Sequence, residues 1–305
     1  MPMASYLLPR YRFMDELYRT LVDIPETVTV SAPIHQENAY FMIIDDIDFG
    51  TMYRNQMAQA GGKEKPASVW DAKAADMQKS PDSSPYTRAF IELTNLDGCN
   101  TLLDMGCGTG AITLALAPGM QQVTGVDYST GMLQVFRHTA RELGLSNIHT
   151  IQRAWEDSWR DIPQADLVIA SRSTAVMDMA DALRKLDQTA RKRVCLTNLA
   201  GGSFIDTGLL KAMGRKIIPK PDYIYILNIL YQMGRFPRLD YIEARGRLAG
   251  TDSIDEFVTK AESSLGPLTA DEKQRIADWY HADPERGRRG GEGFKWAFIS
   301  WDTDN

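Results

Sequence analysis

The chain has 305 residues with 44% hydrophobic and 24% charged residues, an ordinary globular composition, and its formal net charge is −6 with a pI near 5.3. The acidic balance argues against a broad nucleic-acid-binding surface, because phosphate binding depends on clustered Lys and Arg. A membrane span of ~20 apolar residues and a secretory signal are both missing, and the three cysteines lack metal-ligand spacing, so we expect a cytoplasmic protein with no membrane partner and no metal.

The N-terminal part of the chain predicts helix rather than sheet. Apolar residues at helical spacing between Tyr11 and Val22 predict an amphipathic helix, and residues 60–66 have linker composition. We interpret residues 1–66 as a helical N-terminal extension that serves as a lid, followed by a main domain over residues 67–305.

The run from Leu102 to Gly110 is the most informative stretch of the main domain. It predicts a short strand carrying Asp104, then a turn with alternating glycines at 106, 108 and 110, then a helix over Ala111–Ala117. The next predicted strand, Gln122–Val126, ends at Asp127, where a carboxylate can accept hydrogen bonds from both hydroxyls of a ribose. These features predict a nucleoside-containing cofactor.

Two cofactor classes fit this turn. Gly106, Gly108 and Ala111 match the looser G-x-G-x-x-G/A dinucleotide pattern, with Asp127 about 20 residues further on. Asp104 favours the other class, because its carboxylate would repel a pyrophosphate and attract a cationic amino-acid group. The segment resembles the first motif of the class I (Rossmann-like) S-adenosylmethionine (SAM)-dependent methyltransferases, an acidic residue, x, G-x-G-x-G, and the resemblance runs over roughly residues 68–200.

The resemblance implies roles for particular residues. Asp104 would lie near the cofactor's ammonium, although it could instead cap the following helix. Met132 would cover the adenine, although core packing explains it about equally well, and one of Trp155, Glu156 and Asp157 would face the adenine amino group. The residues that the resemblance places at the cofactor are Asp104, Gly106, Cys107, Gly108, Gly110, Asp127, Tyr128, Met132, Trp155, Glu156, Asp157 and Ser171.

The rest of the main domain alternates strand and helix. Helix is predicted over Met132–Leu143, and strands over 147–152, 165–170 and 193–198, which is typical of parallel β-α-β units. Two late strands, near 239–245 and 294–298, would supply the antiparallel hairpin of the family. We therefore predict an α/β fold with a doubly wound, mostly parallel seven-stranded sheet and helical insertions at about 203–235 and 252–282.

The predicted activity is methyl transfer from SAM to a small-molecule acceptor, with S-adenosylhomocysteine (SAH) as the product. The chain lacks the N/D-P-P-Y/F run of amino-methylating DNA enzymes, and no histidine has a partner at catalytic spacing, so His281 is only a weak candidate for a base. The extension and the aromatic segment Tyr223–Tyr231 would enclose the acceptor. RNA or protein methylation and an inactive SAM-binding sensor stay open as alternatives, and a homodimer is compatible with the sequence.

Overall fold

The computed structural model describes residues 43–61, 65–74, 84–216 and 218–303. The chain divides into two units, Met1–Ile43 and Ile44–Asn305, and the fold below is that of the second unit. The helix expected between Tyr11 and Val22 lies outside the described residues. Among the described helices, none combines the length and apolar composition that crossing a bilayer requires.

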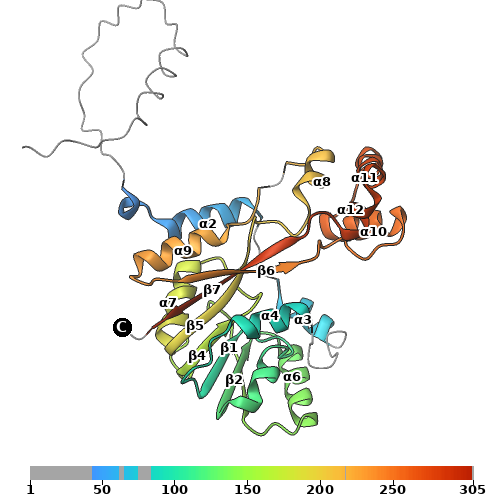
Figure 1. The fold of residues 1–305 in the computed structure, drawn as a ribbon. Coiled ribbons are helices and arrows are strands. Elements are labelled where there is room, and N and C mark those ends of the chain that lie inside the picture. The colour runs from blue at the N-terminus through green and yellow to red at the C-terminus, as the bar shows by residue number, and fades with distance from the viewer. Residues whose placement is uncertain (1–42, 62–64, 75–83, 217, 304–305) are drawn as a thin grey trace, which may run out of the picture. The chain divides into compact units, whose positions relative to one another are not determined.

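A seven-stranded sheet with the order β3-β2-β1-β4-β5-β7-β6 forms the centre of this unit (Figure 1). Strands β1 to β5 pair in parallel, and β7 runs antiparallel between β5 and β6. The strands are β1 (Thr101–Met105), β2 (Gln122–Asp127), β3 (Ile148–Gln152), β4 (Ala165–Ala170), β5 (Ala190–Leu199), β6 (Arg238–Ala244) and β7 (Phe294–Asp302). The predicted doubly wound sheet with a late antiparallel hairpin is confirmed.

Helices connect these strands. They are η1 (Ile44–Asp46), α2 (Phe49–Gln59), α3 (Ala67–Ala74), α4 (Pro85–Leu93), α5 (Thr113–Leu116), η2 (Ala117–Gly119), α6 (Thr130–Glu142), α7 (Met179–Thr189), α8 (Thr207–Ala212), α9 (Tyr223–Gln232), α10 (Ile254–Leu265), α11 (Ala270–Ala282) and α12 (Pro284–Arg289). Most begin at a side chain that accepts a hydrogen bond from the first turn, as Ser129 does from Met132 N at the start of α6.

Two of these helices differ from the sequence prediction. The helix after the glycine turn is one α-turn long and passes into a 3-10 turn at Ala117, because Pro118 lacks the N–H that a continuing helix needs. Residues 284–289, which lie beyond the predicted helical insertion at about 252–282, form α12, because Pro284 suits a first helical position and Asp283 accepts a hydrogen bond from Arg286 N.

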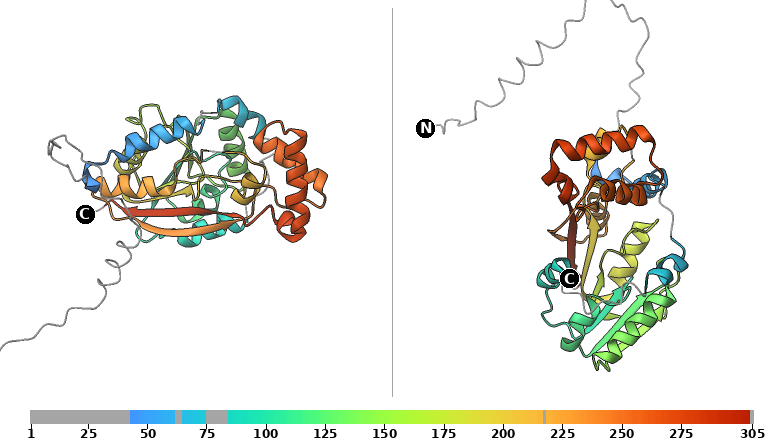
Figure 2. Two further views of the ribbon diagram at one scale, coloured as in Figure 1. Left: turned by 90° about the horizontal axis from the view of Figure 1, so that it is seen from above. Right: turned by 90° about the vertical axis from the view of Figure 1, so that its right-hand side faces the viewer.

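Helices cover both faces of the sheet. Alternate residues of each strand point to opposite faces, so Leu103 packs in one core with residues of α2, α7 and α9, while Leu102 packs in another with residues of α4 and α5. Figures 1 and 2 show α2 and α9 side by side on one of these faces. The buried face of α9 therefore contributes to this layer, and the part of Tyr223–Tyr231 in enclosing an acceptor stays a prediction.

A lobe of four helices, α8 and α10 to α12, has a core of its own in which Leu209, Phe257, Ile276 and Trp279 are buried together. Its larger part is the insertion between β6 and β7. Because β6 and β5 both run antiparallel to β7, β6 ends at the same edge of the sheet as the parallel strands. The lobe thus begins at the carboxyl edge, where ligands bind in sheets of this kind.

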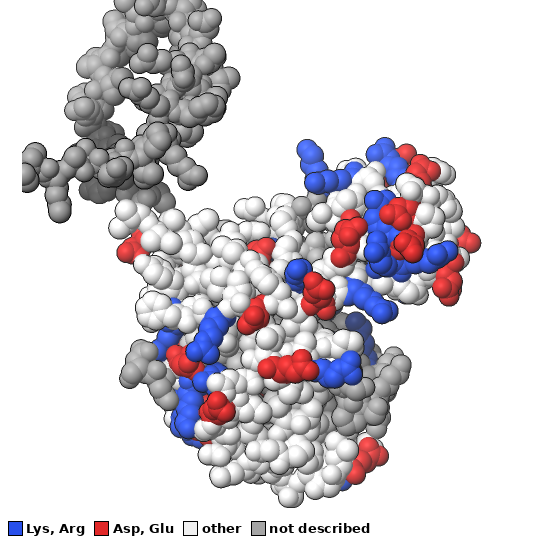
Figure 3. All heavy atoms as spheres, viewed as in Figure 1, with Lys and Arg blue, Asp and Glu red and all other residues white. Residues whose placement is uncertain are grey.

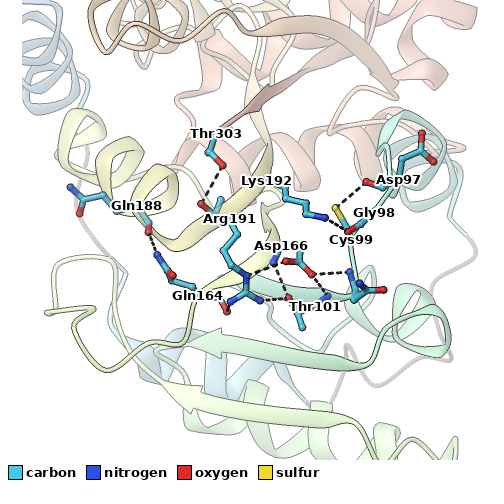
Figure 4. A network of polar contacts seen from close by, with 12 residues as sticks. Asp97, Gly98, Cys99, Thr101, Gln164, Asp166, Gln188, Arg191, Lys192 and Thr303 are labelled. Carbon is cyan, nitrogen blue, oxygen red and sulfur yellow. Dashed lines mark hydrogen bonds and ion pairs between the residues drawn. The ribbon is translucent and has the colours of Figure 1, made fainter. Parts of the chain in front are cut away.

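The opposite, amino edge of the sheet is held by a buried carboxylate. Asp166 accepts hydrogen bonds from the backbone N–H groups of Asn100 (2.9 Å) and Thr101 (3.1 Å) and pairs with Arg191 (3.0 Å), as Figure 4 shows. Although burial acts in the opposite direction, these hydrogen bonds lower the pKa of Asp166 to about 2. Asp166 ties the start of β1 to β4 and β5, far from the carboxyl edge.

Candidate cofactor site

The turn after β1 contains three glycines with positive φ, Gly106 (74°), Gly108 (54°) and Gly110 (86°). A Cβ at Gly106 would lie 2.3 Å from Ser173 Cβ, and one at Gly110 would lie 2.4 Å from the Phe136 ring. A Cβ at Gly108 would meet no atom within 4 Å. Gly106 and Gly110 therefore serve close packing, whereas the backbone at Gly108 borders open space that a ligand can enter.

Asp127, at the end of β2, is tied directly to this turn. Its Oδ2 accepts the N–H of Gly108 (2.9 Å) and its Oδ1 accepts the N–H of Ser129 (2.8 Å). Burial raises its pKa, and the two backbone hydrogen bonds act against that shift. Each carboxylate oxygen carries two lone pairs, so both retain capacity to accept a hydroxyl.

Asp104, in the strand that leads into the turn, is buried, and only one of its two carboxylate oxygens has a hydrogen-bond partner among the described residues. Its Oδ2 accepts a short hydrogen bond from the Thr113 hydroxyl, while its Oδ1 is buried with no hydrogen-bond partner among the described residues. Burial, reinforced by the nearby Asp127, raises its pKa to about 7. Helix α5 has no side-chain cap, so Asp104 does not take the capping role that the sequence left open.

Helix α3 covers the start of α6 beside this turn. Asp71 accepts hydrogen bonds from the Ser129 hydroxyl (2.6 Å) and from Gly131 N (2.8 Å), and Tyr128 donates its hydroxyl to Lys65 O (2.9 Å). Met132, in the first turn of α6, is buried with 2% of its surface exposed. Met132 therefore packs in the protein interior, and its contact with adenine stays a prediction.

The segment after β3 carries the three candidates for the adenine amino group. The Trp155 ring packs on Trp159 with centroids 5.4 Å apart, and Asp157 Oδ2 accepts the N–H of Ala154 (2.8 Å). Glu156 is exposed. Asp157 thus shapes its own loop, and the choice among these three residues stays a prediction.

A polar cluster that the sequence did not predict lies beside Ser171, after β4. The Tyr86 hydroxyl, from α4, is 2.8 Å from both Ser171 Oγ and Thr197 Oγ1, and the Arg172 guanidinium lies 4.3 Å from the centroid of the Tyr86 ring. Arg172 has a left-handed backbone (φ 56°), and its N–H donates to Thr197 Oγ1. Burial raises the pKa of Tyr86, with the two hydroxyl contacts acting against it.

His281 lies elsewhere, near the end of α11 in the lobe. It is exposed, and its ring meets the Tyr280 ring edge-on at 5.7 Å. No contact on the described residues joins it to the glycine turn, and its role as a base stays a prediction.

The arrangement fits SAM. A buried carboxylate oxygen without a partner at Asp104 suits an ammonium donor, Asp127 offers lone pairs to ribose hydroxyls, and Gly108 leaves room for a ligand against the backbone. Cys107, the remaining turn residue, is buried with a thiol pKa raised by its burial, so it serves packing.

Comparison with known proteins agrees with this geometry. The model of the "Methyltransferase domain" family matches residues 102–192. A Haemophilus influenzae protein, itself described only as uncharacterized, is 36% identical over 266 residues, covering 86% of this chain and 99% of that protein. An uncharacterized methyltransferase of Schizosaccharomyces pombe is 37% identical over 82 residues, covering 27% of this chain and 29% of its own length.

Among solved structures, a candidate methyltransferase from Bacillus halodurans superposes with a TM-score of 0.52 at 14% identity, covering 73% of this chain and 100% of that chain. This likeness concerns the fold. The family match runs from β1 to the start of β5 and so includes the glycine turn and Asp127. Residues 102–192 therefore form a methyltransferase domain, and the fold around them is that of the class I SAM-dependent methyltransferases.

Proposed function

We propose that the chain binds SAM at the turn between β1 and α5 and transfers its methyl group to a small-molecule acceptor at the carboxyl edge of the sheet. The observations that carry the cofactor assignment are the buried Oδ1 of Asp104, which has no hydrogen-bond partner among the described residues, and the open space at Gly108 in the same turn. A dinucleotide would bring a pyrophosphate toward this carboxylate, which disfavours it.

Each residue has a defined task in this proposal. Asp104 would hold the α-ammonium, Asp127 the ribose hydroxyls, and Gly106 to Gly110 would form the backbone floor. SAM, when bound, supplies a methyl group on a sulfonium, which reacts by in-line displacement. The protein therefore mainly has to align an acceptor lone pair and keep water away, and a dedicated base is not needed where the acceptor is already deprotonated.

Calorimetry with SAM, SAH and NAD on the full chain tests the cofactor assignment. We expect binding of SAM and SAH and none of NAD; binding of NAD alone would overturn it. Transfer is then measured as SAH formation with acceptor mixtures. SAM binding without transfer to any small molecule would support the inactive sensor, and strong methylation of bulk tRNA would support an RNA substrate.

A further inference from the structure

A wall of aromatic side chains extends from the cofactor site toward the loop that precedes α8. The Tyr86 ring meets Trp296 of β7 at 6.0 Å, and Trp296 meets Phe204, after β5, at 5.6 Å. Phe204 and Trp296 are half-buried, so the wall keeps accessible surface. Because Tyr86 also contacts Ser171 beside the turn, this wall begins at the cofactor site.

Cations lie over this wall at both ends. The Arg172 guanidinium lies 4.3 Å from the centroid of Tyr86, and that of Arg247 lies 5.8 Å from the centroid of Phe204. Lys65 is close enough to Arg247, Lys73 and Lys220 that their charges, after its own burial, lower its pKa. Lys65 O accepts a hydrogen bond from the hydroxyl of Tyr128, which follows β2. Lys65 therefore also lies at the carboxyl edge of the sheet.

Within the described residues, no ion pair joins Arg172, Arg247 or Lys65 to a carboxylate, whereas several other arginines, such as Arg191 and Arg193, are paired. Carboxylates on the same rim are engaged by backbone N–H groups instead: Asp71 accepts from Gly131 N, and Asp222 accepts from Gly201 N and Tyr223 N. Figure 3 shows Lys and Arg side chains in the recess below the lobe.

We propose that the methyl acceptor is a small anion, an apolar or aromatic body bearing a carboxylate or phosphate, held by Arg172 and Arg247 against the wall of Tyr86, Trp296 and Phe204. This inference rests on the proposed SAM-binding function. Concentrating cations around one edge of a chain whose net charge is −6 attracts an anion to that edge alone. A guanidinium group over an aromatic ring can donate two parallel hydrogen bonds to a carboxylate or phosphate. The ring meanwhile packs against the apolar part of the same ligand. A small acceptor is favoured over RNA because the chain as a whole has a net negative charge.

The test is calorimetry on the full chain saturated with SAH, using two matched probe pairs: 2-naphthoate against neutral 2-naphthamide, and 1-naphthyl phosphate against neutral 1-naphthol. We expect at least one anion to bind roughly ten-fold more tightly than its neutral counterpart, as loss of one charge-assisted contact implies. The double variant R172Q/R247Q should reduce this preference to within about three-fold. R238Q, which removes an exposed arginine at the start of β6 on the amino edge, should keep it.

Equal affinity for both members of each pair, no binding of any probe, or an unchanged preference in R172Q/R247Q would overturn the anionic acceptor. Bulk tRNA and free 1-naphthyl phosphate are then compared as competitors of the bound anion, by the concentration of phosphate groups that each needs to displace it. If tRNA displaces the anion at the lower concentration, the acceptor is not a small molecule. SAH binding, measured first on each variant, separates these failures from a failure of the SAM assignment.

Discussion

The backbone N–H of Gly108 donates to Asp127 Oδ2 at 2.9 Å, so the glycine turn after β1 and the carboxylate at the end of β2 form one unit. Asp127 has two tasks in this arrangement, because the carboxylate that we assign to the ribose also holds the turn in place. The first two predictions follow from this link.

Asp127→Ala should weaken SAH binding by about 1.5–3 kcal/mol, because the ribose hydroxyls lose a charged acceptor and Gly108 loses its anchor. Asp127→Asn keeps an oxygen acceptor for one backbone N–H and should lose less. Calorimetry gives the affinities, and thermal unfolding checks that both variants fold. Wild-type affinity in a folded Asp127→Ala protein would remove this residue from the site.

Gly108→Val and Gly110→Val should fail in different ways. At Gly108 the new Cβ enters open space, so we expect a folded protein, strained by about 1–2 kcal/mol through its positive φ, that no longer binds SAH. At Gly110 the Cβ would lie 2.4 Å from the Phe136 ring, and the protein itself should be strongly destabilised. Urea unfolding and SAH titration distinguish the two. Normal binding by Gly108→Val would remove Gly108 from the cofactor site.

SAH or SAM binding should release a proton near pH 6 to 7. The pKa of Asp104 is raised by burial from 3.8 to about 7, so much of this group is protonated in the free protein, and a bound ammonium would favour its ionised form. Calorimetry in buffers of different ionisation enthalpy counts the proton, and affinity should rise with pH through this range. Asp104→Asn is the control and should show neither effect. A wild-type proton count of zero at pH 6 would contradict the placement of the ammonium.

The same shift makes Asp104 a pH-dependent element of stability. Its folded pKa lies above its unfolded value, so its contribution to the unfolding free energy is complete below about pH 4 and is lost as pH rises to about 7. Urea unfolding without ligand should show this decline in the wild type. Asp104→Asn, which cannot ionise, should lack this component, and parallel profiles for the two proteins would refute the assignment.

Asp166 should act in the opposite direction at the other edge of the sheet. Its folded pKa is about 2, below the unfolded value of 3.8, so its contribution is complete above about pH 4 and is lost as pH falls toward 2. Asp166→Asn should therefore cost roughly 2 kcal/mol at pH 7 and less at pH 3. Urea unfolding at both pH values measures the difference. SAH affinity should stay unchanged at pH 7, since Asp166 lies at the amino edge.

Local sequence patterns predicted the sheet well. The strand Ala165–Ala170 is apolar except for Asp166 and is bounded by polar residues, and the whole strand is buried, as a central parallel strand should be. The turn from Asp104 to Gly110 was predictable for the same reason, since its chemistry lies within a few consecutive residues. The length of α5, the ends of β5 and β7, and the helix α12 were not predicted correctly.

Contacts between distant segments were not predictable from one sequence. Tyr86 lies in a helix before the first strand, yet its hydroxyl meets Ser171 and Thr197, residues that follow or lie in strands much later in the chain. Nothing in the local pattern marks Tyr86 as more than a helix residue. The left-handed backbone of Arg172 is equally invisible, because non-glycine residues adopt it only where the surrounding structure imposes it.

The separate core of the lobe has a consequence for how such enzymes diversify. Phe257 and Trp279 stack on each other inside the lobe, in a cluster that contains no residue of the sheet. Substitutions there can reshape the loops that carry Phe204 and Arg247 without disturbing β1, β2 or the glycine turn. A lineage can therefore exchange one acceptor for another while its cofactor chemistry stays constant, and transplanting a lobe between relatives becomes a practical route to altered specificity.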